Sequence, residues 1–258
     1  MSLRTTLLPS ALAPSHLLSS PTRNAPAWPG RTDYRLGNPG HPSEVPTLLI
    51  ADFDNSGSVT SPAGTDPLSN RFAEVARAFS VVARNGAQHE LGVVMHFDTP
   101  SRGDVGPVPI TRRGLTRLKS GLHVPADGAG SSELRPSLRR AVEIAEAHPD
   151  HEATLVVLSD FWLLDPEPAN VFSELATFPG DVHAVVLGAH LAADALDERI
   201  TVTHIERGDP PGAVARALFS SLVAHRPGSH VHKAVLTHSA AAPVADSTTP
   251  FPSPTPLA

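Results

Sequence analysis

Short apolar runs alternate with amphipathic segments along the middle of this 258-residue chain, and this alternation restricts its possible folds more than any other feature. The first run reads Leu-Leu-Ile-Ala-Asp-Phe at 48–53, and the segment 70–84 that follows carries apolar residues at helical spacing. Strands that are apolar at nearly every position are buried on both faces, so they need helices on both sides of their sheet. The pattern predicts an α/β fold.

The same alternation continues through the rest of the central segment. Strands are expected at 47–53, 91–97, near 108, and at 154–159, 181–188 and 201–205. Helices are expected at 70–84, 132–147, 169–177 and 211–224, with one further helical turn before 122. Ser132 is a candidate N-terminal cap of the second of these helices. Together these elements predict a doubly wound, mainly parallel six-stranded sheet flanked by helices, as in Rossmann-like folds.

Proline-rich segments flank this unit on both sides. Residues 1–45 and 227–258 mix proline with small and polar residues and show no hydrophobic period. Such composition cannot bury enough apolar surface to offset the entropy of ordering the chain. We therefore predict a single domain at 46–226, with disordered segments at 1–45 and 227–258.

The composition excludes several functions. A net charge of −6 provides no basic surface for nucleic acid, and no stretch approaches the roughly 20 apolar residues of a membrane span. The absence of cysteine excludes disulfides, thiolate catalysis and Cys-based zinc sites. Pro9 and Pro14 interrupt the only candidate export signal. A cytoplasmic location is expected, and export is left open.

Oxygen-bearing side chains follow two of the predicted strands. Asp54, Ser56 and Ser58 form an Asp-x-Ser-x-Ser pattern directly after the first strand, and Asp160 follows the strand at 154–159. Between them, a glycine-rich segment ends at Ser132. In doubly wound sheets, ligands bind outside the carboxyl ends of the strands, where the strand order reverses. Carboxylate and hydroxyl oxygens there suit Mg²⁺, Mn²⁺ or Ca²⁺.

This arrangement resembles the metal-ion-dependent adhesion site of von Willebrand factor type A domains. In that family, Asp-x-Ser-x-Ser follows the first strand, a threonine lies in a glycine-rich loop, and an aspartate follows the fourth strand. The resemblance implies one divalent cation, Mg²⁺ or else Mn²⁺ or Ca²⁺, held by Asp54, Ser56, Ser58, Ser132 and Asp160. It also implies binding without catalysis, to a protein partner that offers an Asp or Glu to the metal. Bacterial proteins of this kind often work beside AAA+ ATPases, so such a partner is expected.

Two positions depart from the family pattern. Ser132 replaces the threonine, which keeps the hydroxyl and loses a methyl group, and Phe161 stands where the family commonly has glycine. The next residues leave two possibilities open, because Trp162 to Leu164 could form an apolar rim beside the metal or lie buried beneath the following loop. Asp52 and Asp98 could be outer partners of the site or ordinary strand-end carboxylates.

Two rival functions fit part of the sequence. Asp52-Phe53-Asp54 also matches the Asp-x-Asp motif of haloacid dehalogenase-type phosphatases, with Asp52 as nucleophile and Asp54 as general acid. That mechanism needs a lysine after a later strand, and residues 160–232 contain none. The other rival is a scaffold that keeps the von Willebrand factor type A-like fold and binds no metal. His230, His232 and His238 have a spacing that could bind a transition metal, but in a Pro/Ala-rich tail we expect them to be solvated. His96 and His183 lie within predicted strands and are expected to be satisfied core residues.

Overall fold

The structure is a computed structural model that describes residues 34–62, 64–66, 70–189, 191 and 195–232. Most of the flanking segments predicted to be disordered therefore lies outside the described residues. The elements are β1 (Gly37–Asn38), β2 (Thr47–Phe53), α1 (Gly57–Thr60), α2 (Arg71–Val82), the 3₁₀ turn η1 (Ala83–Asn85), β3 (Glu90–His96), β4 (Val105–Pro109), α3 (Gly114–Ser120), α4 (Arg135–Glu146), β5 (Glu152–Ser159), α5 (Pro168–Leu175), β6 (Asp181–Leu187), β7 (Thr201–Ile205), α6 (Ala213–Leu222) and β8 (His230–Val231).

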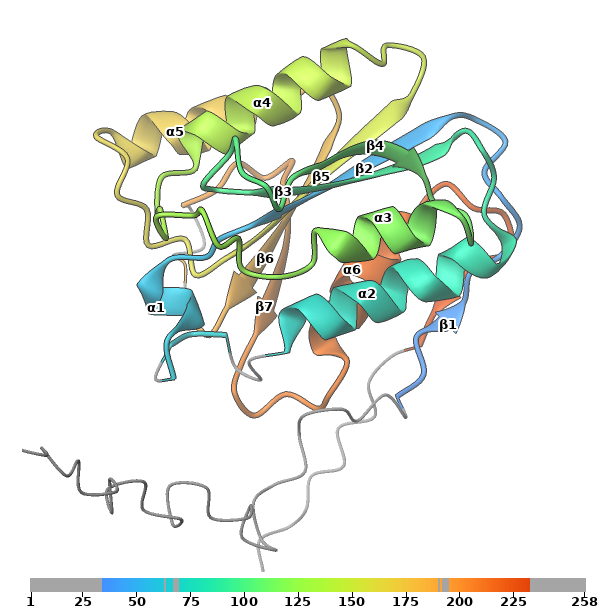
Figure 1. Ribbon diagram of the computed structural model, residues 1–258, viewed down its shortest axis with the longest axis horizontal. Coiled ribbons are helices and arrows are strands. Elements are labelled where there is room, and N and C mark those ends of the chain that lie inside the picture. The colour runs from blue at the N-terminus through green and yellow to red at the C-terminus, as the bar shows by residue number, and fades with distance from the viewer. Residues whose placement is uncertain (1–33, 63, 67–69, 190, 192–194, 233–258) are drawn as a thin grey trace, which may run out of the picture.

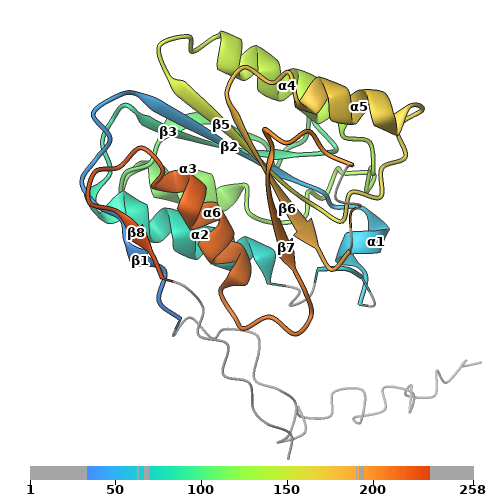
Figure 2. The same cartoon turned by 180° about the vertical axis from the view of Figure 1, so that it is seen from behind.

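Six strands form one sheet in the order β4-β3-β2-β5-β6-β7, and only β4 runs antiparallel to its neighbour. Helices α4 and α5 cover one face, while α2, α3 and α6 cover the other (Figures 1 and 2). The predicted doubly wound, mainly parallel six-stranded sheet is confirmed. Strand β2 lies at its centre, and the strand order reverses between β2 and β5, so a ligand is expected at the carboxyl ends of these two strands.

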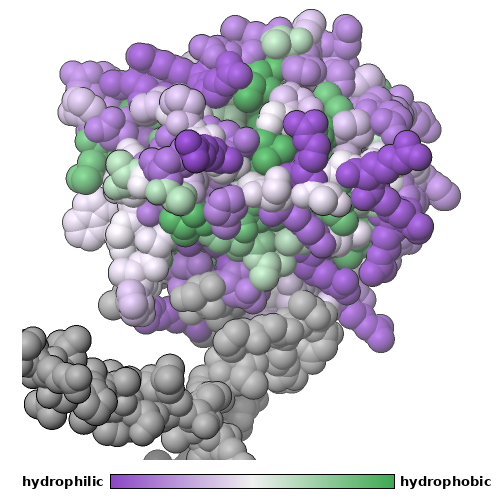
Figure 3. Space-filling model, in the orientation of Figure 1, coloured by the Kyte–Doolittle hydropathy of each residue, from purple (hydrophilic) through white to green (hydrophobic). Residues whose placement is uncertain are grey.

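The core consists of two apolar layers, one on each face of the sheet. Along β2, Leu48 and Ile50 point toward α4 and α5, whereas Leu49, Ala51 and Phe53 point toward α2 and α6. All of these side chains are buried, as expected for a central parallel strand. The outer surface is mostly hydrophilic on the face that Figure 3 shows, with small, separated apolar patches. Within the described segments, no helix has the length and apolar character to cross a membrane.

Helix α4 begins three residues later than predicted, and its N-terminal cap is not Ser132. The carboxylate of Asp165, which is buried, accepts hydrogen bonds from the backbone N–H groups of Leu134 (2.9 Å) and Arg135 (3.0 Å). A carboxylate from another loop therefore satisfies the free N–H groups at the start of this helix. Because the helix begins at Arg135, the Ser132 side chain lies outside it.

At the opposite end of the sheet, a buried ion pair joins segments that are distant in sequence. Arg226, which follows α6, contacts both carboxylate oxygens of Glu90 at 2.5 and 2.7 Å and donates to the carbonyl oxygen of Pro39 at 2.7 Å. Nearby, β1 and β8 pair as a small antiparallel sheet. Figure 1 shows β1 and α1 at opposite ends of the domain, so this ion pair lies away from the Asp-x-Ser-x-Ser segment.

His183 in β6 is a satisfied core histidine, as expected. Its Nδ1 lies 2.8 Å from the Ser221 hydroxyl and its Nε2 lies 2.8 Å from the Thr203 hydroxyl. Burial lowers the pKa of His183 to about 4, because the charged imidazolium would lose its hydration. The folded protein therefore holds this ring neutral at pH values where the unfolded chain would already bind a proton.

This difference predicts acid sensitivity. The pKa of His183 in the folded protein lies below its unfolded value of about 6.5. The stability that the neutral ring contributes is therefore fully present above that pH and is lost as the pH falls toward 4. We expect the free energy of unfolding to be about 2 kcal/mol lower at pH 5 than at pH 7 on account of His183. Urea denaturation of the wild type and of His183→Gln measures this. Equal pH slopes for the two proteins would contradict the assignment.

Candidate metal centre

Asp54 is held at the point where β2 ends beside β5. Its backbone N–H donates to the carbonyl oxygen of Leu158 at 3.1 Å, which continues the strand pairing by one residue. Its side chain is fully buried, with Oδ1 accepting from the N–H of Ser56 at 2.8 Å and Oδ2 from the hydroxyl of Ser159 at 2.6 Å. The carboxylate thus has a fixed orientation, set by both its own loop and the neighbouring strand.

The two serines of the motif are close together. Ser56 precedes the single helical turn α1, and its hydroxyl oxygen lies 2.9 Å from that of Ser58. Neighbouring oxygens around an octahedral Mg²⁺ at 2.0–2.1 Å from the metal are also about 2.9 Å apart. Ser56 is buried and Ser58 is exposed, so the pair extends from the interior to the surface. This spacing fits two adjacent ligands of one cation.

Asp160 comes directly after β5, and its carboxylate lies near Asp54. It is 4% exposed, and it accepts hydrogen bonds from the backbone N–H of Trp162 (3.0 Å) and the hydroxyl of Thr65 (3.2 Å). The N–H of Thr65 in turn donates to the carbonyl oxygen of Ser58 at 2.7 Å. Burial raises the pKa of Asp54, and the negative charge of Asp160 raises it further. Two carboxylates that repel each other in this way provide a favourable place for a cation.

The glycine-rich loop before α4 contacts both of the other loops. Gly130 has φ +71°, and a Cβ atom added to it would lie 3.6 Å from the carbonyl oxygen of Asn55. The carbonyl oxygen of Ser132 accepts from the N–H of Leu164 at 3.1 Å, which places this residue beside the Asp160 loop. The Ser132 hydroxyl makes no hydrogen bond with any residue that the structure describes. The structure thus brings the three loops together, and a metal-ligand role for Ser132 stays a prediction.

Asp98 holds this glycine-rich loop in place. Its Oδ1 accepts from the N–H groups of Ala129 (3.0 Å) and Ser131 (2.9 Å), and its Oδ2 accepts from that of Gly130 (3.3 Å). All of the donors are backbone groups, so the position of Asp98 determines where the loop lies. Asp98 could be an outer partner of the site or an ordinary strand-end carboxylate, and these hydrogen bonds favour the first role.

A buried arginine beneath the motif is a functional candidate that sequence reasoning missed. Arg71 is 3% exposed, and its Nη2 donates to the carbonyl oxygen of Asp54 and to Oδ1 of Asn55, both at 2.9 Å. Its Nη1 donates to Asp66 at 3.1 Å. The sequence does carry a signal, since Arg71 lies four residues before Val75 and therefore on the apolar face of its helix. A charged residue on that face needs a partner.

The side chain of Asn55 is held from a second direction. Its amide nitrogen lies 2.9 Å from Nδ1 of His96, whose Nε2 lies 3.0 Å from the carbonyl oxygen of Gly121. A carbonyl oxygen can only accept, so Nε2 carries the proton and Nδ1 accepts from Asn55. Burial lowers the pKa of His96, which keeps the ring neutral and suited to this arrangement. His96 is thus the core histidine that the sequence predicts.

Asp52 does not lie at the site. Its side chain is fully buried on the α4 face, where Oδ2 accepts from the hydroxyl of Ser137 at 2.6 Å and Oδ1 has no partner among the described residues. Burial raises the pKa of Asp52 to about 7, because the charged carboxylate would lose its hydration. A carboxyl group enclosed in this way cannot reach a phosphate ester, which removes the nucleophile of the phosphatase alternative.

The segment after Asp160 alternates between the interior and the solvent. Phe161 has φ +58°, a conformation that favours glycine, and its ring is buried. Leu163 is also buried, whereas Trp162 is 74% exposed and Leu164 is 66% exposed. Leu163 is therefore buried as one possibility has it, and Trp162 and Leu164 are exposed, while their place beside a metal stays a prediction.

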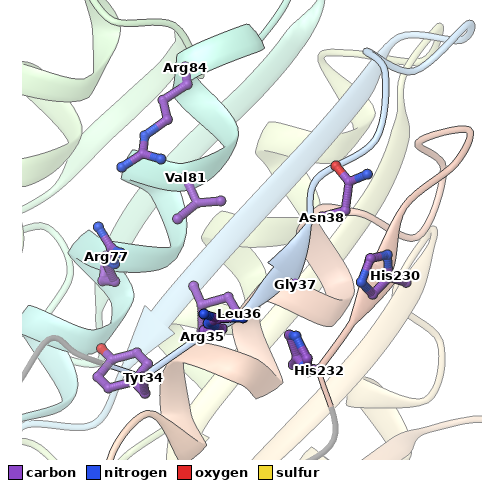
Figure 4. Close-up of a pocket in the computed structure, with 10 residues that line it drawn as sticks. All are labelled: Tyr34, Arg35, Leu36, Gly37, Asn38, Arg77, Val81, Arg84, His230 and His232. Carbon is purple, nitrogen blue, oxygen red and sulfur yellow. The ribbon is translucent and has the colours of Figure 1, made fainter.

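The donor set is limited to two carboxylates and neutral hydroxyls. In the part of the chain that the structure describes, no three His, Cys, Asp or Glu side chains gather where they could hold a metal ion. A hollow of about 510 Å³ between α2, β1 and β8 is lined instead by arginines and exposed histidines, namely Arg35, Arg77, Arg84, His230 and His232 (Figure 4). The residues that line this hollow include no carboxylate, so it lacks the charged oxygen donors that Mg²⁺ or Ca²⁺ prefers.

The chain resembles von Willebrand factor type A domains. A von Willebrand factor type A protein from Catenulispora acidiphila aligns at 15% identity with a TM-score of 0.48, covering 73% of this chain and 48% of its own length. The SpRpn10 VWA domain aligns at 13% identity with a TM-score of 0.41, and the alignment covers 67% of this chain and 94% of that domain.

The pilus adhesin SpaC from Lactobacillus rhamnosus GG aligns at 12% identity with a TM-score of 0.47, covering 72% of this chain and 30% of the adhesin. This chain therefore spans about half the length of the Catenulispora protein and less than a third of the adhesin. No protein family matches the chain by sequence, and no curated protein does.

The support that Arg71 gives to the motif can be tested through stability. Arg71→Met leaves Asp66, the Asp54 carbonyl and the Asn55 side chain without this buried donor, so we expect a loss of about 3–5 kcal/mol in the free energy of unfolding. The exposed Arg84, which forms no ion pair with a described residue, is the matched control, and Arg84→Met should change stability by less than about 0.5 kcal/mol. Urea denaturation measures both, and similar values for the two variants would contradict the role of Arg71.

Proposed function

We propose that this chain is a von Willebrand factor type A-like interaction module that holds a divalent cation and binds an acidic residue of a protein partner through it. The proposed ligands are Asp54, Ser56, Ser58, Ser132 and Asp160, some of them through water. The observation that carries the proposal is the Asp54 carboxylate, which is tied to β5 through Ser159 and followed by two hydroxyl oxygens 2.9 Å apart. This is a hard-oxygen donor set at the switch point of a doubly wound sheet.

The protein's own residues prepare the site before any partner arrives. Hydrogen bonds fix the orientation of both carboxylates, and Arg71 and Asp98 fix the backbones of two of the loops. When bound, a divalent cation would supply a positive charge that two carboxylates nearly neutralise, together with open or water-filled coordination positions. Ser58 is exposed, which leaves the outer side of the site accessible.

An acidic partner fits this donor set best. Hydroxyls are weak, neutral ligands, so the site has room for one more negative oxygen on its exposed side. A carboxylate from the partner would supply it, despite the net charge of −6 on this chain. Through the family resemblance, an AAA+ ATPase is the partner class that we propose. The role that we propose is binding without catalysis.

Metal titration tests the proposal. Isothermal titration with Mn²⁺ and with Mg²⁺ should give one site per chain in the wild type, and Asp54→Asn should weaken it at least tenfold. Asp181 is the matched control, because it is an exposed aspartate at the amino end of β6, and Asp181→Asn should bind as the wild type does. Thermal denaturation confirms that both variants are folded.

The alternatives predict other results. A metal-free scaffold would take up no cation in any of the three proteins. A phosphatase would hydrolyse p-nitrophenyl phosphate in the presence of Mg²⁺, and we expect no such turnover. Wild-type affinity in folded Asp54→Asn would overturn the ligand assignment.

A further inference from the structure

Two large apolar side chains are exposed beside the proposed metal ligands. Among the described residues, the exposed large hydrophobic side chains are Val45, Val124, Trp162, Leu164, Val202 and Val231. Trp162 and Leu164 are the most exposed of this set, at 74% and 66%, and they are separated by a single residue. We use the name apolar rim for Trp162 and Leu164. A tryptophan held in solvent is a common anchor of protein interfaces.

The backbone of the rim is bound directly to the candidate ligands. The N–H of Trp162 donates to Oδ1 of Asp160 at 3.0 Å, and the N–H of Leu164 donates to the carbonyl oxygen of Ser132 at 3.1 Å. Each exposed side chain therefore starts from a residue that is hydrogen-bonded to a proposed ligand residue. The rim is therefore a neighbour of the site through the backbone of both residues.

The exposure of the rim is imposed by its neighbours. Phe161, with φ +58°, packs near Phe172 with 6.4 Å between ring centroids, and Leu163 is buried in the same core cluster. Since both of these residues point inward, the two that alternate with them point outward. An L-residue in a left-handed conformation is strained, and such strain persists only where the surroundings determine it. Burial of Phe161 and Leu163 thus fixes Trp162 and Leu164 in solvent.

We infer that the apolar rim is the second half of the partner-binding surface, and that it selects a segment in which a large apolar side chain stands next to the metal-binding Asp or Glu. The inference rests on the proposed function. Charge complementarity requires a carboxylate at the cation, and the adjoining rim offers apolar area that water solvates poorly. One short segment of a separate protein can satisfy both only if its acidic and apolar side chains are neighbours.

Selection from a displayed library of random 12-residue peptides tests this inference on the full chain. Peptides are bound in Mg²⁺ and released with EDTA. We expect the wild type to enrich Asp or Glu beside Trp, Phe or Leu. The variant Trp162→Ser/Leu164→Ser should still enrich the acid and lose the apolar preference. Val202→Ser/Val231→Ser removes two exposed apolar side chains away from the site, one at the amino end of β7 and one in β8, and should select as the wild type does.

Binding of a synthetic peptide from this selection gives the quantitative readout. The chain contains two tryptophans, so in a Trp28→Phe background Trp162 is the only one, and its emission should shift to shorter wavelength as the peptide covers it. The rim variant carries no tryptophan in that background, so anisotropy of the labelled peptide measures its affinity, which we expect to be at least tenfold weaker. An affinity within twofold of the wild type, or the same selected sequences, would overturn the inference.

The outcomes separate the two proposals. If EDTA releases the peptides but the rim variant behaves as the wild type, the rim inference fails and the metal-dependent function stands. If EDTA has no effect on binding, the proposed function itself fails. A second copy of this chain, offering the exposed pair Glu44 and Val45, is the competing occupant. A dimer in Mg²⁺ that the rim variant abolishes, measured by light scattering, would overturn the assignment to a separate partner.

Discussion

The parallel pairing of β2 with β5 is the constraint on which the candidate site depends. It brings the carboxyl ends of the two strands together, so Asp54 and Asp160 lie at one edge of the sheet. Asp54 is hydrogen-bonded there to Ser159, which comes 105 residues later in the sequence. The pairing is itself fixed by apolar burial, since β2 and β5 are covered on both faces. A shift of one residue would move every side chain of a strand to the other face, and the buried core forbids it.

Polar groups beneath the site depend on the same burial. Arg71, His96 and Asp165 lie almost fully out of solvent, where an unsatisfied polar group costs about 1–3 kcal/mol. Most of their polar atoms have partners in the described structure, and some of those partners are backbone groups of the site loops. The loops are thus held by groups that cannot move without losing buried hydrogen bonds. Such support gives binding sites a fixed geometry.

The sequence predicted the features that follow from local pattern. Buried strands such as 47–53 are recognisable because they are apolar at nearly every position, and the order of the motifs along the chain placed them at the correct strand ends. The predicted cap of α4 was wrong, because Asp165 competes for the same N–H groups from a loop that is distant in sequence. Local spacing carries no information about such a partner.

The missed features have similar causes. Arg71 contacts the motif from 17 residues away in sequence, so only its place on an apolar helix face could have revealed it. Which of the residues after Asp160 are exposed depends on the left-handed conformation of Phe161, which the identity of that residue disfavours. Prediction from sequence was reliable where burial repeats periodically and failed where one tertiary contact decides the conformation.

We propose that one divalent cation binds at the carboxyl ends of β2 and β5. Crystals of the full chain grown with Mn²⁺ test it directly, because anomalous scattering locates the metal independently of the chain tracing. We expect a single peak within about 2.1 Å of the Ser56 and Ser58 hydroxyl oxygens, and at the same distance from the Asp54 carboxylate or from a water that it holds. A peak elsewhere on the protein, or an empty site at saturating Mn²⁺, would contradict it.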